Sequence, residues 1–211
     1  SRGLGDVYKR QEQELNEIVK KIENAEFKVS DIKTSERFRK APLPFTTSTL
    51  QQEAAKALNF GTQKTMRIAQ QLYEGVDIKG GGTVGVITYL RTDSTRIADE
   101  ADASAREYIA SVYGEKYIAA GQTKQAEGKK IQDAHEAIRP TDISRTPASI
   151  KESLTRDQFR LYQLIWKRFA ASRMMPAQYE STSVKIAAGQ YRFSVSTSRC
   201  CLLYTSPSPR D

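Results

Sequence analysis

The sequence predicts an α+β fold in which a mainly helical domain is inserted into a β-rich domain. Apolar residues recur at helical spacing through much of residues 46–171, and alternating apolar and polar residues occur near both ends of the chain. Proline-containing segments stand at the junctions. We therefore expect the helical domain at residues 42–175, with residues 12–41 and 176–200 forming the β-rich domain.

The first elements belong to the β-rich domain. Residues 12–23 are highly charged and carry apolar residues at helical spacing, which predicts an amphipathic helix (Leu15, Ile18, Val19, Ile22). Residues 27–34 alternate apolar and polar residues, which is typical of a half-buried strand. Pro42 and Pro44 then interrupt regular structure, because each lacks an amide donor and restricts the residue before it. We place a domain boundary there.

The helical domain starts with a predicted pair of helices. Residues 46–48 are candidate caps for a helix that ends at residues 59–61, and residues 65–73 form the second helix. The pair is either a helix-turn-helix that reads DNA or part of a plain core. Gly75 and residues 80–82 predict turns before a short strand at residues 84–89.

Helical spacing resumes at residues 93–108, with Ser94 or Thr95 as the cap. Residues 119–130 are small and polar, which indicates an exposed loop. Helices follow at 148–150 and 155–171, the second with a core-facing stripe (Phe159, Tyr162, Ile165, Trp166, Phe169). Residues 181–186 and 190–196 predict a hairpin around residues 187–189, which we expect to pair with the strand near residue 27.

Residues 88–95, with the sequence TYLRTDST, carry the strongest chemical signal. Tyr89 is a candidate nucleophile for a phosphodiester, and Arg91 offers a permanently charged planar fork for the phosphate oxygens. In an extended segment, residues 89, 91 and 93 project to one face. Asp93 would either orient Arg91 or cap the following helix. Without these neighbours, Tyr89 would be interpreted as a buried strand tyrosine.

Residues 133–141, with the sequence DAHEAIRPT, form a second motif around the single histidine. If residues 133–138 are helical, His135 and Arg139 lie on one face and could approach a phosphate. Pro140 disfavours helical geometry at Arg139, whose guanidinium could instead pair with Glu136 or Asp142. A lone histidine in such a turn is otherwise structural or simply exposed.

Together with residues 45–54, the two motifs resemble the bacterial type IA DNA topoisomerases over most of residues 41–180. Leu90, Glu136 and Arg139 follow the pattern of the topoisomerase I branch. The resemblance implies an isomerase that breaks and rejoins one DNA strand without ATP and relaxes negatively supercoiled DNA. Tyr89 would form a 5′-phosphotyrosyl intermediate with single-stranded DNA and Arg91 would stabilise the phosphorus centre. Asp93, His135 and Arg139 would support the site or bind DNA.

The family also implies Mg²⁺ held by an acidic domain that precedes this region. No Asp-x-Asp-x-Glu cluster occurs in residues 12–199, so no metal ligand is expected in this fragment and the fragment alone is expected to be inactive. Two alternatives remain, namely a non-catalytic DNA-binding module and the topoisomerase portion of a reverse gyrase.

The formal net charge is +8, which favours a polyanionic partner such as DNA. Neither a transmembrane segment nor a signal peptide is expected, so we expect a cytoplasmic location. We also expect a monomer. Residues 201–211 can be encoded by a transposase-type sequencing adapter, and its reverse complement encodes residues 1–11. We therefore interpret both ends as adapter translation, and removing the net charge of +2 in residues 1–11 leaves +6.

Overall fold

The computed structural model describes residues 4–119 and 135–200, with side chains from residue 12 onward. The chain divides into two compact units. One unit is the continuous stretch Lys40–Pro176, and the other joins Ser1–Arg39 to Ala177–Asp211. Among the described residues, no helix combines the length and apolar character needed to cross a membrane. The α+β class predicted from the sequence is confirmed.

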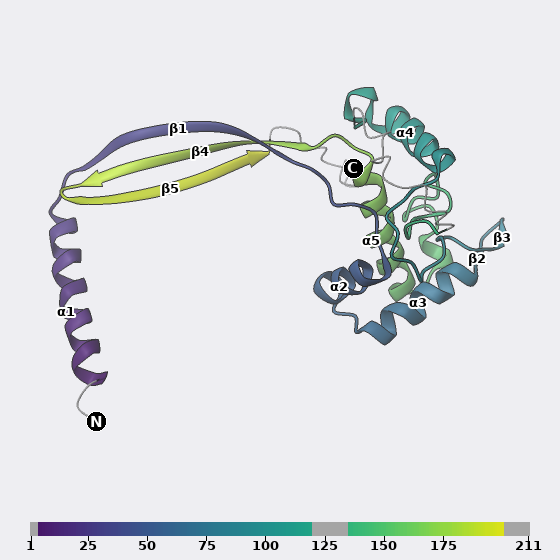
Figure 1. Cartoon of the computed structure of the whole chain (residues 1–211), viewed down its shortest axis with the longest axis horizontal. Coiled ribbons are helices and arrows are strands. Elements are labelled where there is room, and N and C mark those ends of the chain that lie inside the picture. The colour runs from purple at the N-terminus through teal and green to yellow at the C-terminus, as the bar shows by residue number, and fades with distance from the viewer. Residues whose placement is uncertain (1–3, 120–134, 201–211) are drawn as a thin grey trace. The chain divides into compact units, whose positions relative to one another are not determined.

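The discontinuous unit contains one helix and a three-stranded antiparallel sheet. Helix α1 is Leu4–Glu23, and the strands β1 (Phe27–Arg39), β4 (Ala177–Ala188) and β5 (Tyr191–Cys200) lie side by side in the order β1-β4-β5 (Figure 1). The β4–β5 hairpin turns at Gly189, whose φ of 59° lies in the left-handed region that suits glycine. The predicted hairpin and its pairing with the strand near residue 27 are therefore confirmed.

The predicted half-burial of residues 27–34 is wrong. Phe27, Val29 and Ile32 are 57%, 59% and 62% exposed. Their strand lies at the edge of the three-stranded sheet, and no described part of the chain covers these side chains. A sheet buries a face only when a second layer packs against it. The apolar and polar alternation therefore predicted the strand correctly but not its environment.

The Lys40–Pro176 unit is mainly helical. It contains α2 (Thr47–Leu58), α3 (Thr62–Glu74), α4 (Asp99–Tyr113) and α5 (Arg156–Ser172), with short 3₁₀ helices at Glu115–Tyr117 (η1) and Lys151–Ser153 (η2). Helix α5 packs against both α2 and α3, which lie close to it in Figure 1. The core between these elements is apolar and includes large, fully buried side chains (Phe45, Leu50, Leu72, Leu161, Ile165, Phe169).

Helix ends in this unit follow the local chemistry. Thr46 caps α2 by accepting a hydrogen bond from the Thr49 amide, and Thr155 caps α5 in the same way through Gln158. Helix α2 ends at Leu58, and the capping residue Asn59 has a φ of 57°, in the left-handed region. The helices predicted at residues 46–58, 65–73 and 155–171 are confirmed, with small shifts of their ends.

Three predicted elements differ from the structure. The apolar run at residues 84–89 forms a strand only at its start, in a small hairpin of β2 (Val76–Ile78) and β3 (Gly82–Val84). The helix predicted from residue 93 begins at Asp99, because the Thr92 and Ser94 hydroxyls accept the amides of Ser94 and Arg96 and hold turns there. Residues 148–150 are a turn that precedes η2. The loop predicted at residues 119–130 lies outside the described residues except for Ala119, which is buried.

A partly buried ionic cluster joins α4 to the end of α5. Asp102 receives hydrogen bonds from Arg106 Nε at 2.7 Å and from Arg173 Nη1 at 2.8 Å. Burial by itself would raise the pKa of the Asp102 carboxyl, but the hydrogen bonds from Arg173 and Arg106 outweigh it and hold the pKa below the usual 3.8. The carboxylate therefore stays ionised inside the fold.

Candidate functional site

The two sequence motifs lie against each other in the Lys40–Pro176 unit. The Thr88 amide donates to the Arg139 carbonyl at 2.9 Å, and the Thr141 amide donates to the Val86 carbonyl at 3.0 Å. An isolated antiparallel bridge joins Ile87 to Pro140 between these bonds. The Tyr89 segment, residues 85–93, and the His135 segment, residues 135–141, are therefore extended partners. The helix considered for residues 133–138 is not formed in the part of it that the structure describes.

Thr88, the residue before Tyr89, is held to the His135 segment by its own side chain. Its Oγ1 donates to the Ala137 carbonyl at 2.7 Å and accepts the Arg139 amide at 3.0 Å. One hydroxyl thus satisfies two backbone groups of the His135 segment, which gives Thr88 a directional role that valine could not fill. This positioning role was not predicted, although Thr88 stands inside the motif.

Thr47 makes the same arrangement on the other side of Tyr89. Its Oγ1 donates to the Leu90 carbonyl at 2.7 Å and accepts the Thr92 amide at 2.9 Å. The Thr47 amide in turn donates to the Thr92 carbonyl at 2.9 Å. Because these bonds reach the residues on both sides of Arg91, the first turn of α2 determines the path of the chain there. The sequence indicated Thr47 only as a candidate cap.

The last turn of α3 fixes the start of the Tyr89 segment. The Leu72 carbonyl accepts the Val86 amide at 2.9 Å. A Cβ at Gly85 would lie 2.5 Å from the Tyr73 carbonyl oxygen, which is closer than such atoms approach in proteins. Gly85 is therefore required by close contact between backbones, and not by an unusual φ.

Tyr89 lies at the surface of the Lys40–Pro176 unit. Tyr89 is 42% exposed, whereas Leu90 and Thr92 are 1% and 8% exposed. Arg91 and Asp93 are exposed, so burial alternates along the segment as an extended chain predicts. The predicted shared face of residues 89, 91 and 93 is consistent with this alternation.

Two aromatic rings flank the Tyr89 ring. The Tyr73 ring lies edge-on with its centroid 5.5 Å away, and the His135 ring lies 6.1 Å away with an interplanar angle of 32°. Tyr73 and His135 are both exposed. The structure thus brings His135, which is 46 residues away in sequence, beside Tyr89.

The charged residues of the two motifs differ in how they are engaged. In the described residues, the Arg91 guanidinium and the Asp93 carboxylate have neither a hydrogen bond nor an ion pair. Asp93 does not cap α4, because that helix begins at Asp99. Asp93 is therefore not the cap of α4, and no hydrogen bond or ion pair joins its carboxylate to Arg91. Arg91 remains available for an anionic ligand.

Arg139 is already paired. Its Nη2 lies 2.6 Å from the Glu136 carboxylate, its Nε donates to the same oxygen at 2.8 Å, and its Nη1 donates to the Pro140 carbonyl at 3.0 Å. This is the alternative in which Glu136 takes up the guanidinium. Only 12% of the Arg139 side chain is exposed, so its contribution to anion binding requires breaking these contacts.

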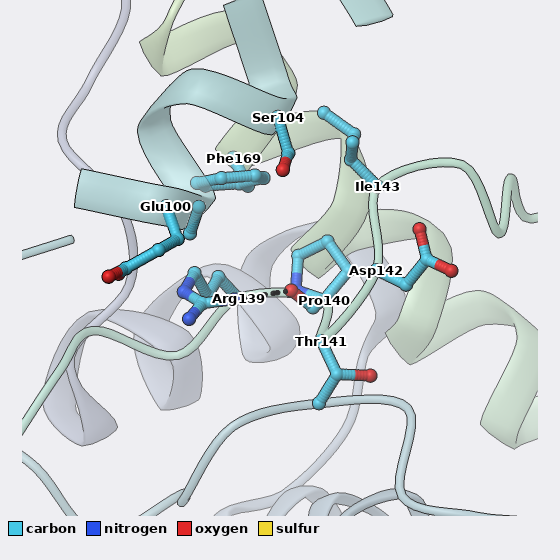
Figure 2. A pocket seen from close by; sticks show the side chains of 9 residues that line it. Glu100, Ser104, Arg139, Pro140, Thr141, Asp142, Ile143 and Phe169 are labelled. Atoms are coloured by element: carbon cyan, nitrogen blue, oxygen red, sulfur yellow. Dashed lines mark hydrogen bonds between the residues drawn. The ribbon is translucent and has the colours of Figure 1, made fainter. Parts of the chain in front are cut away.

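A pocket of about 290 Å³ lies beside Arg139. Glu100 and Ser104 of α4 line one side of it, and residues 139–143 line the other (Figure 2). Helix α5 holds this wall, because the Trp166 indole donates to the Ile143 carbonyl at 2.9 Å and the Tyr162 hydroxyl donates to the Arg145 carbonyl at 2.6 Å. The chain that directly follows the His135 segment is thus anchored to α5.

A divalent cation has no fitting set of ligands in the described part of the chain. No group of three or more histidine, cysteine, aspartate or glutamate side chains gathers there in a way that could hold a metal ion.

Comparisons with known proteins match this region closely. The family model described as DNA topoisomerase matches residues 6–201. Among solved structures, the chain is similar to full-length topoisomerase I from Thermotoga maritima, with 45% sequence identity and a TM-score of 0.75. The similarity covers 87% of this chain and 30% of that chain, so this chain spans less than a third of the solved relative. The family match overlaps residues 6–11 and 201, whose origin in an adapter stays a prediction.

Proposed function

The chain belongs to the DNA topoisomerase family, and on that premise we propose that it is the tyrosine-bearing part of a type IA topoisomerase I. In this proposal Tyr89 breaks and rejoins one strand of DNA without ATP. The resulting strand passage relaxes negatively supercoiled DNA. The observation that carries the proposal is an exposed Tyr89 on a backbone that hydrogen bonds hold on both sides. Two residues on lies Arg91, whose guanidinium has no ion pair with any described residue.

The proposed reaction is a transesterification. The Tyr89 phenol loses its proton and its oxygen bonds to phosphorus, while the bond from phosphorus to the 3′ oxygen breaks and that oxygen takes up a proton. The 5′ phosphate remains linked to Tyr89 until the 3′ hydroxyl reverses the step. Arg91 stabilises the charge that grows on the non-bridging oxygens. The proposal assigns the transfer of these two protons to none of the described residues.

His135 has a supporting role in this proposal. Its ring lies beside the Tyr89 ring on the exposed side, where it can contact a DNA phosphate or limit the rotation of the phenol. Asp93 is near enough in sequence to steer Arg91 when DNA is bound. Arg139 is assigned to holding the His135 segment through Glu136, and it contacts DNA only if that pair opens.

The test uses the complete enzyme that contains this chain and a labelled single-stranded oligonucleotide. Tyr89→Phe should abolish the covalent protein–DNA adduct that survives denaturant, while binding of the oligonucleotide persists. Tyr73→Phe is the matched control, because Tyr73 is a neighbouring phenol that is exposed to a similar extent, 39% against 42%. This control should retain the adduct.

An adduct that persists in Tyr89→Phe would refute the assignment of the nucleophile. A non-catalytic DNA-binding module would bind DNA in both variants and form an adduct in neither. The isolated chain is expected not to relax DNA, and Mg²⁺-dependent relaxation by the purified chain would contradict that expectation. Binding should be sensitive to salt and stronger for single strands, because phosphate contacts dominate such affinity.

A further inference from the structure

The three-stranded sheet has two chemically different faces. Its register places Val29, Ile186 and Phe193 in one row across the strands, and Ile32, Val184 and Val195 in the next apolar row. Side chains directly opposite each other in a sheet point to the same face. One face of the sheet is therefore apolar at the end near the β4–β5 turn, where the Phe27 and Phe193 rings lie 6.2 Å apart.

A β-bulge at Ser30 keeps this separation of faces. The register shifts between Val29 and Asp31, so an extra residue lets Val29 and Ile32 point the same way although they are three apart. The Ser30 hydroxyl donates to the Lys185 carbonyl at 3.1 Å and holds the bulge against β4. Without the bulge, the apolar residues on its two sides would point to opposite faces.

The opposite face of the sheet is basic. The register assigns to it six basic side chains and one acidic side chain, Asp31, with serines filling most of the positions between them. We call it the basic face (Lys28, Lys33, Arg37, Arg39, Lys185, Arg192). Two of these charges have weak, exposed partners: Lys28 lies 2.9 Å from Glu26, and Lys185 lies 3.9 Å from Asp31.

Three charges on β1 are free of such partners. Lys33, Arg37 and Arg39 are exposed, and within the described residues they make no ion pair or side-chain hydrogen bond. Alternate residues of a strand lie about 6.7 Å apart, so these side chains form a row of positive charge along one edge. A shallow hollow of about 530 Å³ adjoins this face at the bulge, lined by Ser30, Lys185, Arg192 and Ser194, with Phe193 at its side.

We propose that the basic face binds the phosphate backbone of DNA, as a contact surface separate from the Tyr89 site. Positive side chains interspersed with serine hydroxyls match the charge and acceptor groups of phosphates. Tyr179 is the only aromatic residue that the register places on this face, so the binding does not rely on base stacking. The choice of DNA as the polyanion rests on the proposed function, whereas the surface itself follows from the register.

The test measures the affinity of the 211-residue chain for labelled oligonucleotides over a range of salt concentrations. Lys33→Gln combined with Arg37→Gln should weaken binding by tenfold or more at 0.1 M salt and reduce the slope of log K against log salt by about 1.4 for a single strand, because each phosphate contact contributes about 0.7. A duplex of the same length should lose affinity as well.

The matched control removes the same charge from another part of the same unit. Lys20→Gln combined with Lys21→Gln lowers the net charge equally, and both lysines are exposed on α1. It should leave the salt slope unchanged. A second variant, Lys33→Arg with Arg37→Lys, keeps both charges and should bind like the unchanged chain.

Equal losses in the two neutralised variants would show an effect of net charge alone and would overturn the proposal, as would no loss in either. A loss confined to single strands would overturn the assignment to the phosphate backbone. Tyr89→Phe should not change this binding. If Tyr89 forms no adduct while the basic-face variant still weakens binding, only the catalytic proposal fails. If Tyr89 forms the adduct while the basic-face variant binds like the unchanged chain, only the proposal for the basic face fails.

Discussion

Removal of the Thr88 hydroxyl tests whether hydrogen bonds to one side chain hold the two motifs together. Thr88→Val keeps the shape of the side chain but leaves the Ala137 carbonyl and the Arg139 amide without their partner. Ala137 is fully buried, so water cannot replace the hydroxyl without opening the structure. Each orphaned group costs about 1–3 kcal/mol, so for the two groups we expect a loss of about 2–6 kcal/mol in the free energy of unfolding.

Urea unfolding followed by tryptophan fluorescence measures this loss in the Lys40–Pro176 unit, which contains both motifs. Trp166 is the single tryptophan of the chain and lies in the core, 8% exposed. With a slope of about 2 kcal/mol per molar urea, the midpoint should fall by about 1–3 M. Thr88→Ser is the control, since it keeps the hydroxyl and loses one methyl group, worth about 0.8 kcal/mol. If the valine variant is as stable as the serine variant, the hydroxyl does not join the motifs and the reasoning fails.

Two further predictions concern the close contact at Gly85 and the ionic cluster at Asp102. Gly85→Ala should lower the thermal midpoint and the yield of covalent adduct in the complete enzyme, because the new Cβ would collide with the Tyr73 carbonyl. Gly81→Ala is the control. Its new Cβ meets only an ordinary contact at 3.6 Å, so it should have little effect on either measurement. Asp102 has a pKa below 3.8 in the folded chain, so its stabilising effect is complete above that pH and is lost as the pH falls through the folded value. Acid unfolding should therefore show a contribution that Asp102→Asn removes, and identical acid profiles for the two chains would contradict this.

Local patterns in the sequence predicted the elements whose stability is local. Thr46 and Thr155 cap helices through bonds to residues three positions away, and these bonds depend on a few neighbouring side chains. The β4–β5 hairpin likewise follows from alternation around a glycine turn. These features could be found without knowing what packs against them.

The parts that could not be predicted depend on distant partners. Thr47 was recognisable as a cap candidate, but its bonds to Leu90 and Thr92 join residues more than forty positions apart. The start of α4 was placed too early, because helical spacing at residues 93–98 gave no sign that the Thr92 and Ser94 hydroxyls would hold turns. The exposure of β1 was also missed, since alternation shows which residues share a face but not what covers that face.

The candidate site shows the same division. Tyr89 and Arg91 could be selected from residue chemistry and family resemblance, and their neighbourhood with His135 needed the pairing of two segments. The Thr88 hydroxyl supports that pairing, and the Thr47 hydroxyl joins the other side of the Tyr89 segment to α2; each donates to a carbonyl and accepts the amide two residues later. Both chain directions out of Tyr89 are therefore fixed by side chains that take no part in the proposed chemistry.

This arrangement has a consequence for how the phenol meets its substrate. Thr88 and Leu90 are held to the His135 segment and to α2, and Gly85 is pressed against the end of α3. The backbone of Tyr89 then has little freedom relative to α2 and α3 once this unit has folded, while its ring remains partly exposed. We therefore expect the aim of the Tyr89 oxygen at a phosphate to be set by side-chain rotation against Tyr73 and His135. Approach of DNA to the site would not require the Tyr89 segment to rearrange.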